Sequence, residues 1–309
     1  MESFSRGWSF LQQAWSMAFK DKDLLKPSIY ALIVGMIVSV IGIIPIILAA
    51  FILGDSRFAN IVYFVFGGLL VFVQFTVSYI FSAMTIYLIY GYVSEGDGRM
   101  DRAWAIVRRD FFDILTLAAV STVVNMLKNA ANRNRNRRGG IGAIGAGLIS
   151  SFAGVFEALW TEASYLVLPA MVIDDLNLKD GLSKIWKITK ENLLLIGIST
   201  VGVRWVTGLI SFVLVVIGLA LGFGIFYLVT LVLGFELLGL IAGIGLGFGA
   251  GSIFFMLASV ISSYTTTAYH TCLYIWARDV ERATVSQEQG VPVRIPAPAP
   301  LAAVLGYQS

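Results

Sequence analysis

Charged side chains inside apolar segments are the residues of this sequence that could do chemistry. Glu162 and Arg204 stand in neighbouring apolar runs, ~17 Å and ~18 Å from the same bilayer edge at ~1.5 Å per helical residue. Ionisable groups at such depth are costly, and they are usually paired or functional. We therefore predict a Glu162–Arg204 ion pair, which either fixes the register of two helices or serves as a substrate, ion or proton site.

Three further ionisable residues are candidates for a polar pathway. Glu157 lies about 140° round a helix from Glu162, so the two carboxylates face different directions, and Glu157 is the one nearer the water. His270, the only histidine, ends the polar stretch SSYTTTAYH and is either a proton-sensing group or a hydrogen-bonded packing residue. Glu236 lies in a glycine-rich segment and is alternatively a loop residue.

Motifs of known enzyme chemistry are absent from the sequence. HExxH, GxSxG, P-loop and CxxC patterns do not occur. One histidine and one cysteine, Cys272, provide neither a metal centre nor an internal disulfide. The sequence therefore predicts a protein that is not an enzyme and that has no metal site and no cofactor.

Composition places these residues in a membrane protein. Hydrophobic residues make up 58% of the 309 and charged residues 13%, with a mean hydropathy of +0.82. A soluble domain has about a quarter of its residues charged. The net charge of +3 is too small to indicate nucleic acid as a partner. Basic residues are therefore interpreted first as topology signals and contacts to membrane lipids.

An amphipathic segment with a tryptophan precedes a membrane-length apolar run three times. The segments read AWSMAFKDKDLL, AWAIVRRDFFDIL and IWKITKENLLL, and they place Trp15, Trp104 and Trp186 at similar intervals. Trp8 shares the helical stripe of Trp15, so we expect four interfacial anchors. The basic residues beside them are predicted to contact lipid headgroups: Lys20, Lys22, Arg108, Arg109, Lys187 and Lys190.

The predicted fold class is an all-α integral membrane protein of about six transmembrane helices. They form three pseudo-repeats, each a cytoplasmic interfacial helix followed by a transmembrane hairpin. The modules and their spans are 1–93 (28–53 and 59–93), 94–173 (110–127 and 148–173) and 174–277 (193–219 and 251–277). The glycine-rich insert 220–250 forms either a hairpin or one further span, and 278–309 is a proline-rich tail.

The distribution of basic residues predicts the orientation. Most of the 22 Lys and Arg residues fall on the side of the three interfacial helices. The positive-inside rule then places these helices and both termini in the cytoplasm. The basic loop 128–138 falls on the other side, against the rule. This leaves open that 104–127 lies in the inner face of the membrane without crossing it.

Parts of the sequence resemble a known family. RGWSFLQQAWSMAFKDKDLLKPSIYALIVG, FSAMTIYLIYGYVSEGDGRMDRAWAIVRRDFFDIL and the passage from LVLPAMVIDD to GLSKIWKIT are similar to a prokaryotic multipass family described only as domain of unknown function 6159. The resemblance covers most of residues 1–205. It implies a multipass protein of the prokaryotic inner membrane, and it implies no activity, cofactor or residue role.

Two functions are compatible with these features. The favoured prediction is a scaffold or assembly subunit whose platform of interfacial helices binds lipid, a second copy of the chain or another membrane protein. The alternative is a transporter or channel that uses Glu162 and Arg204. An enzyme that acts on lipids is a third, weaker alternative, because no nucleophile or acid–base pair is visible. A polar cavity at mid-depth would favour transport, and a closed bundle would favour the scaffold.

Overall fold

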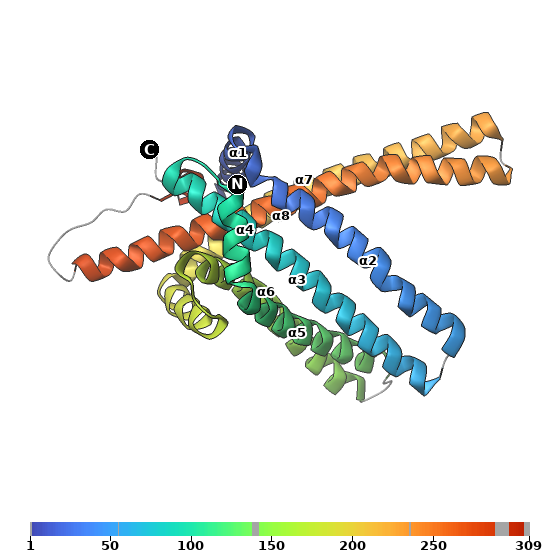
Figure 1. Cartoon of the computed structure of the whole chain (residues 1–309), viewed down its shortest axis with the longest axis horizontal. Helices are drawn as coiled ribbons and strands as arrows, with labels where there is room; N and C mark the ends of the chain where they lie inside the picture. Colours follow the sequence, from blue (N-terminus) through green and yellow to red (C-terminus); the bar gives the residue numbers. More distant parts are fainter. Residues whose placement is uncertain (1, 55, 138–141, 235, 288–296, 306–309) are drawn as a thin grey trace.

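The computed structural model describes residues 2–54, 56–137, 142–234, 236–287 and 297–305 (Figure 1). Within these ranges the chain is almost entirely helical and has no strand. In chain order the elements are α1 Glu2–Lys20, the 3₁₀ turn η1 Lys22–Leu24, α2 Lys26–Leu53, α3 Arg57–Glu95, α4 Met100–Arg109, α5 Phe111–Arg137, α6 Gly142–Asp174, α7 Leu178–Leu233, α8 Leu237–Gln287 and α9 Ala299–Leu305.

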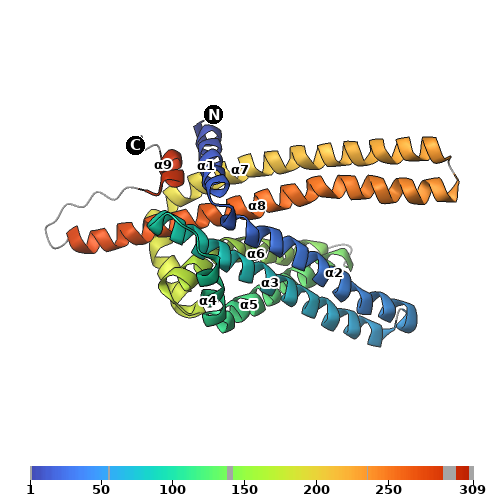
Figure 2. The same cartoon turned by 45° about the horizontal axis from the view of Figure 1, so that its top comes forward.

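Three helical hairpins, α2–α3, α5–α6 and α7–α8, extend from a common base (Figures 1 and 2). The short helices α1, α4 and α9 and the first turns of α7 gather at that base. The first hairpin turns at Gly54, whose φ of 55° suits a residue without a Cβ, and Ser56 caps α3 by accepting from the Ala59 amide. A separate amphipathic helix precedes the first two hairpins (α1 and α4), whereas the third amphipathic stretch is the first part of the continuous helix α7. The equivalence of the three units as repeats stays a prediction.

Six helices are long and apolar enough to cross a membrane, among the residues described. The predicted class of an all-α membrane protein is confirmed. The segments are Lys22–Leu53, Phe58–Glu95, Phe111–Asn132, Ser150–Asp174, Gly202–Leu233 and Leu237–Ala283. Large apolar side chains along them are exposed, which suits contact with lipid. Asp110 separates α4 from α5, so the amphipathic helix and the following span are distinct helices.

The glycine-rich segment 220–250 prolongs α7 and α8 into one long hairpin. The chain reverses at Gly234, where φ is 86°. Glycines of the two helices face each other so closely that a Cβ on Gly247 would lie 2.5 Å from the Gly222 carbonyl oxygen. Small residues at such a contact let two helix backbones approach. Of the two predicted alternatives, the insert is therefore the hairpin.

The hydrophobic core lies at the base of the hairpins. Side chains from α1, α3, α5, α6 and α8 are fully buried there, among them Phe10, Met84 and Leu117. The ring of Phe10 packs edge-on against Tyr269, with 5.5 Å between centroids, and the Tyr264 hydroxyl donates to the Ala14 carbonyl oxygen at 3.0 Å. These contacts fix α1 across α8. Beyond this core the hairpins diverge (Figure 1).

Candidate functional site

A cleft lined by hydroxyl groups lies between α2, α3 and α8. Its volume is about 980 Å³, and no acidic or basic side chain is among the described residues that line it. Ser39, Gln74 and Ser259 line it from near the middle of their helices. Apolar side chains such as Met36 and Phe255 complete the walls. The cleft is therefore amphipathic and without formal charge.

Polar contacts within the cleft connect α2 to α3. The Gln74 amide donates to the Gly35 carbonyl oxygen at 2.9 Å and to the Ser39 hydroxyl oxygen at 2.6 Å. The Ser39 hydroxyl in turn donates to the same carbonyl at 2.9 Å. A partly buried amide that faces apolar surroundings is more stable when it is hydrogen-bonded, so these bonds help to keep this polar group within the apolar hairpin.

A cluster of three ionisable residues joins α6, α7 and α8 beside the cleft. Arg204 forms an ion pair with Glu162 Oε1, so the structure brings together the two residues predicted to pair. Glu162 Oε2 lies 3.4 Å from His270 Nε2. Glu162 occupies the middle of the span Ser150–Asp174, and the His270 side chain is only 3% exposed. His270 is thus a third member of the cluster. Its position in the sequence gave no reason to connect it with the Glu162–Arg204 pair.

Two residues connect this cluster to the cleft. Tyr165 lines the cleft, and its ring stacks on His270 with 5.0 Å between centroids and 21° between planes. Thr266 also lines the cleft, and its carbonyl oxygen lies 2.7 Å from His270 Nδ1. A molecule in the cleft would therefore contact residues that touch His270 directly.

The other two members of the predicted pathway lie elsewhere. Glu157 pairs with Lys128 at 2.6 Å, which joins α6 to α5. Glu236 lies in the turn between α7 and α8, at the far end of the hairpin from the base (Figure 1). Neither residue is among those that line the cleft. The structure therefore brings only His270, of these three, to the Glu162–Arg204 pair.

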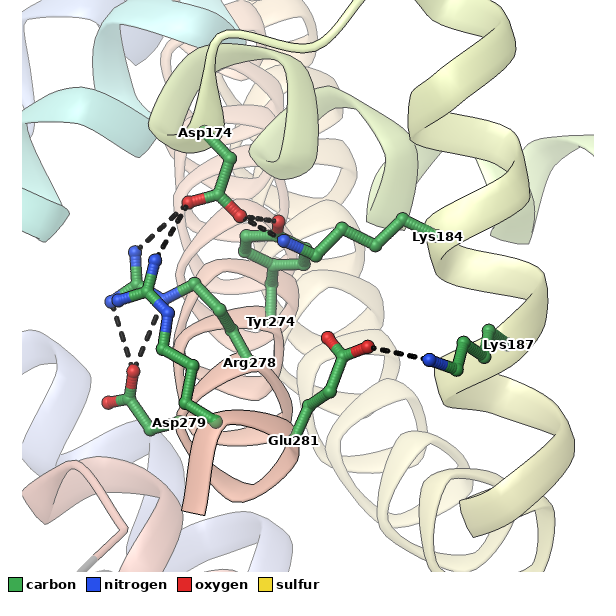
Figure 3. A network of polar contacts seen from close by, with 8 residues as sticks. Asp174, Lys184, Lys187, Tyr274, Arg278, Asp279 and Glu281 are labelled. Carbon is green, nitrogen blue, oxygen red and sulfur yellow. Dashed lines mark hydrogen bonds and ion pairs between the residues drawn. The ribbon is translucent and has the colours of Figure 1, made fainter. Parts of the chain in front are cut away.

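A second ionic cluster, which the sequence did not indicate, surrounds Asp174 at the base (Figure 3). The carboxylate accepts from Lys184 and from the Tyr274 hydroxyl, and its Oδ1 lies 3.4 Å from the Arg278 guanidinium. Arg282 approaches the same oxygen at 3.8 Å. The end of α6, the start of α7 and the end of α8 are thereby tied to one carboxylate.

Arg278 is the most buried charge of this cluster. Its side chain is 8% exposed, it pairs with Asp279 at 3.1 Å and it lies over the ring of Tyr90, 5.5 Å from the centroid. The nearby Lys187–Glu281 pair, at 3.4 Å, is more exposed to water, since the Lys187 side chain is 67% exposed. Figure 3 shows both groups, the one around Asp174 and Arg278 and the Lys187–Glu281 pair.

The four predicted interfacial tryptophans have unlike surroundings. Trp8, Trp104 and Trp186 are exposed. Trp15 packs against Tyr264 and Phe19, and its indole N–H donates to the Thr265 hydroxyl oxygen at 3.2 Å. Trp15 therefore also fixes α1 on α8. The sequence pattern did not set it apart from the other three tryptophans.

The six predicted headgroup residues also divide into two groups. Lys20, Lys22, Arg108 and Lys190 have exposed side chains. Lys187 pairs with Glu281, as above, and Arg109 pairs with Asp110 at 2.6 Å and Asp175 at 3.1 Å. Burial raises the pKa of the Asp110 carboxyl, and the hydrogen bond from Arg109 opposes that rise. Arg109 thus links α4 to the end of α6 besides standing at the surface.

Comparison with known proteins adds no identification. No protein-family model matches the chain, and no curated protein matches it. The resemblance to domain of unknown function 6159 stays a prediction. No group of three or more His, Cys, Asp or Glu side chains suited to a metal occurs within the described residues. The function is therefore argued from the cleft and the two ionic clusters.

Proposed function

We propose that this protein transports an uncharged amphiphile with hydroxyl groups across the membrane, through the cleft between α2, α3 and α8. The observation that supports this best is the cleft itself, a space of about 980 Å³ lined by hydroxyls near the middle of three spans. Its position at mid-depth is what distinguishes a transport pathway from a closed scaffold.

The chemistry of the walls indicates the class of ligand. Serine and threonine hydroxyls both donate and accept hydrogen bonds, so they can match the hydroxyl groups of a sugar or glycerol unit. A charged headgroup would find no opposite charge among the described lining residues, and an unpaired charge removed from water is costly. Phe248, Phe255 and Met256 would contact the apolar part of the ligand.

The membrane and its orientation belong to the same proposal. We propose the prokaryotic inner membrane, with the base of the molecule and both termini in the cytoplasm. The concentration of basic residues at the predicted interfacial helices supports this orientation. The ends of the hairpins, including Glu236, would then face the outside.

A lipid-flipping assay tests the proposal. The full chain is reconstituted into liposomes that contain an acyl-labelled fluorescent glucosyldiacylglycerol, and dithionite bleaches the label in the outer leaflet only. We expect the protein to make nearly all of the label accessible, and to leave acyl-labelled phosphatidylserine inaccessible in the inner leaflet. No movement of the glycolipid above protein-free liposomes would refute the proposal.

Variants on two walls of the cleft make the test specific. Gln74→Leu and Ser259→Leu should each reduce the rate at least tenfold, because they remove polar groups and fill space in the cleft. Ser94→Leu is the matched control, since Ser94 is exposed in the last turn of α3 and does not line the cleft. Flipping that survives both cleft variants would show that the cleft is not the route.

A cytoplasmic platform is the second candidate. The exposed Trp104 and Trp186, with Arg108 and Lys190 exposed near them, favour a surface that contacts anionic lipid. Charge reversal at Arg108 and Lys190 separates the two functions. If transport is the function, the double variant should keep wild-type flipping. A scaffold would instead lose its association with the membrane partner and show no flipping before or after the change.

A further inference from the structure

We propose that Glu162 and His270 together bind one proton, and that Arg204 competes with this proton for the Glu162 carboxylate. The ligand of this site is the proton itself, and its role would be to couple a proton gradient to movement through the neighbouring cleft. That coupling role rests on the proposed function, whereas the binding of the proton does not.

The hydrogen bond at His270 Nδ1 determines which nitrogen carries hydrogen. Nδ1 lies 2.7 Å from the Thr266 carbonyl oxygen, and a carbonyl oxygen can only accept. Nδ1 must therefore be the donor in this contact. In a neutral imidazole only one nitrogen carries hydrogen, so the neutral form of His270 has a bare lone pair on Nε2.

That lone pair faces a carboxylate. Nε2 lies 3.4 Å from Glu162 Oε2, and a deprotonated pair would set two acceptors against each other. A hydrogen on either atom converts the repulsion into a hydrogen bond: imidazolium donates to carboxylate, or a carboxylic acid donates to neutral imidazole. The geometry is therefore that of a pair which holds one proton between its members.

Arg204 makes this proton exchangeable. It pairs with the other carboxylate oxygen, Glu162 Oε1, so the trio without the proton is a neutral ion pair beside a neutral ring. Adding the proton gives the trio a net positive charge, which is unfavourable in an apolar surrounding. About half of the Arg204 side chain is exposed, so it can leave the carboxylate when the proton binds.

The ionisable side chains that the contacts place against His270 or its partner Glu162 come from α6, α7 and α8. From α6 His270 faces Glu162 and Tyr165, from α7 Arg204, and on its own helix Tyr269. Around these, α1 contributes the apolar ring of Phe10 against Tyr269, and α3 contributes Tyr79 near Tyr165. The tyrosine hydroxyls stay protonated in the range where a histidine–carboxylate pair titrates.

The route from the proton to the cleft runs through two contacts. Tyr165 stacks on the imidazole and lines the cleft, and Thr266 holds Nδ1 and also lines the cleft. A change in the position of the His270 ring on proton binding would therefore alter the cleft wall. Conversely, a ligand in the cleft would alter the environment of the proton.

A single histidine permits a direct test in the full chain. Protein labelled with ¹⁵N-histidine, purified through a tag without histidine and placed in lipid nanodiscs, reports both ring nitrogens of His270 alone. We expect Nδ1 to carry hydrogen throughout. On acidification we expect either the Nε2 signal to become protonated or the infrared carbonyl band of a protonated carboxylic acid to appear.

Three variants decide whether this proton belongs to the pair. Glu162→Gln should abolish both signals, whereas Glu157→Gln, on the same helix but paired with Lys128, should keep them. Arg204→Gln should move proton binding to higher pH by about one to three units, because the competing positive charge is removed. The proposal is overturned if neither signal appears, if they survive Glu162→Gln, or if Arg204→Gln moves binding to lower pH.

Flipping measured under a pH gradient separates this inference from the proposed function. A gradient should accelerate glycolipid flipping at least several-fold in the wild type and have no effect on Glu162→Gln. A normal titration without any flipping would refute transport and leave the proton site standing. Flipping that ignores the gradient, in a protein whose His270 does not titrate, would refute the proton site alone.

Discussion

Replacement of Asp174 by asparagine tests whether one carboxylate holds the base of the molecule together. The side chain is 11% exposed and accepts from Lys184, Tyr274 and Arg278, three residues on two other helices. Asparagine has nearly the same shape and no charge. The change therefore removes the attraction while it leaves the packing of α6, α7 and α8 almost unaltered.

The expected cost follows from the burial of the partners. Removing one member of a buried pair costs about 3–5 kcal/mol, because the other charge is left without a partner. Arg278 keeps Asp279 at 3.1 Å, and Lys184 is partly exposed to water, so both are only partly stranded. We therefore expect Asp174→Asn to lower the free energy of unfolding by about 2–4 kcal/mol.

The measurement is an SDS titration of the protein in detergent micelles, followed by circular dichroism. Lys187→Gln is the matched control, since its pair with Glu281 is exposed and should be worth no more than about 1 kcal/mol. Arg278→Gln completes a double-mutant cycle, in which Asp174 and Arg278 should be coupled by more than about 0.5 kcal/mol. An Asp174→Asn variant as stable as Lys187→Gln would refute the reasoning.

Three other predictions address different parts of the molecule. Gly247→Val should destabilise the α7–α8 hairpin by about 1–3 kcal/mol in the same titration, because its Cβ would meet the facing backbone, whereas Gly245→Ala, whose Cβ meets nothing within 4 Å, should not. Burial raises the pKa of Asp110, so the folded state holds this proton more tightly; the stability of wild type relative to Asp110→Asn should therefore be greater at about pH 4 than at about pH 7. In a Cys272→Ala background, an impermeant thiol reagent added to whole cells should label Glu236→Cys and leave Ser183→Cys unlabelled; the reverse pattern would contradict the orientation.

Hydropathy and depth made part of this structure predictable. Long apolar runs indicated the spans, and counting residues from the membrane edge placed Glu162 and Arg204 at similar depth in neighbouring segments. An ionised side chain inside the membrane is unfavourable unless it is paired, and few partners lie at the same depth. The pairing of Glu162 with Arg204 could therefore be predicted. The glycines of 220–250 indicated close helix packing, but not whether it lay within one hairpin or between copies.

The cleft and the Asp174 cluster could not be found in the same way. The polar residues of the cleft recur at helical spacing, as Gln74, Ser78 and Ser82 do on α3, but the spacing along one helix does not say which other helices face it. Asp174 stands in a polar connection at the end of a span, where an acidic residue has an ordinary solvated explanation. Its contact with Arg278, 104 positions along the chain, depends on how the third hairpin packs at the base.

The two polar features at mid-depth differ in how much each implies about function. A serine or threonine can satisfy its own hydroxyl within the helix, as Thr271 does by donating to the Thr267 carbonyl oxygen, so a hydroxyl-lined wall costs little even without a ligand. Glu162 and Arg204 have no such local solution, because each is paired with a residue of another helix, and His270 satisfies only Nδ1 within its own helix, at the Thr266 carbonyl oxygen. Glu162 lies ~18 Å along α6 from Asp174, whereas His270 lies only ~6 Å along α8 from Tyr274 and therefore adjoins the base. If the trio has a purely structural role, its replacement by three apolar residues should leave flipping unchanged, including any response to a proton gradient. If the trio couples the gradient to transport, the same variant should be stable but its flipping should no longer respond to the gradient.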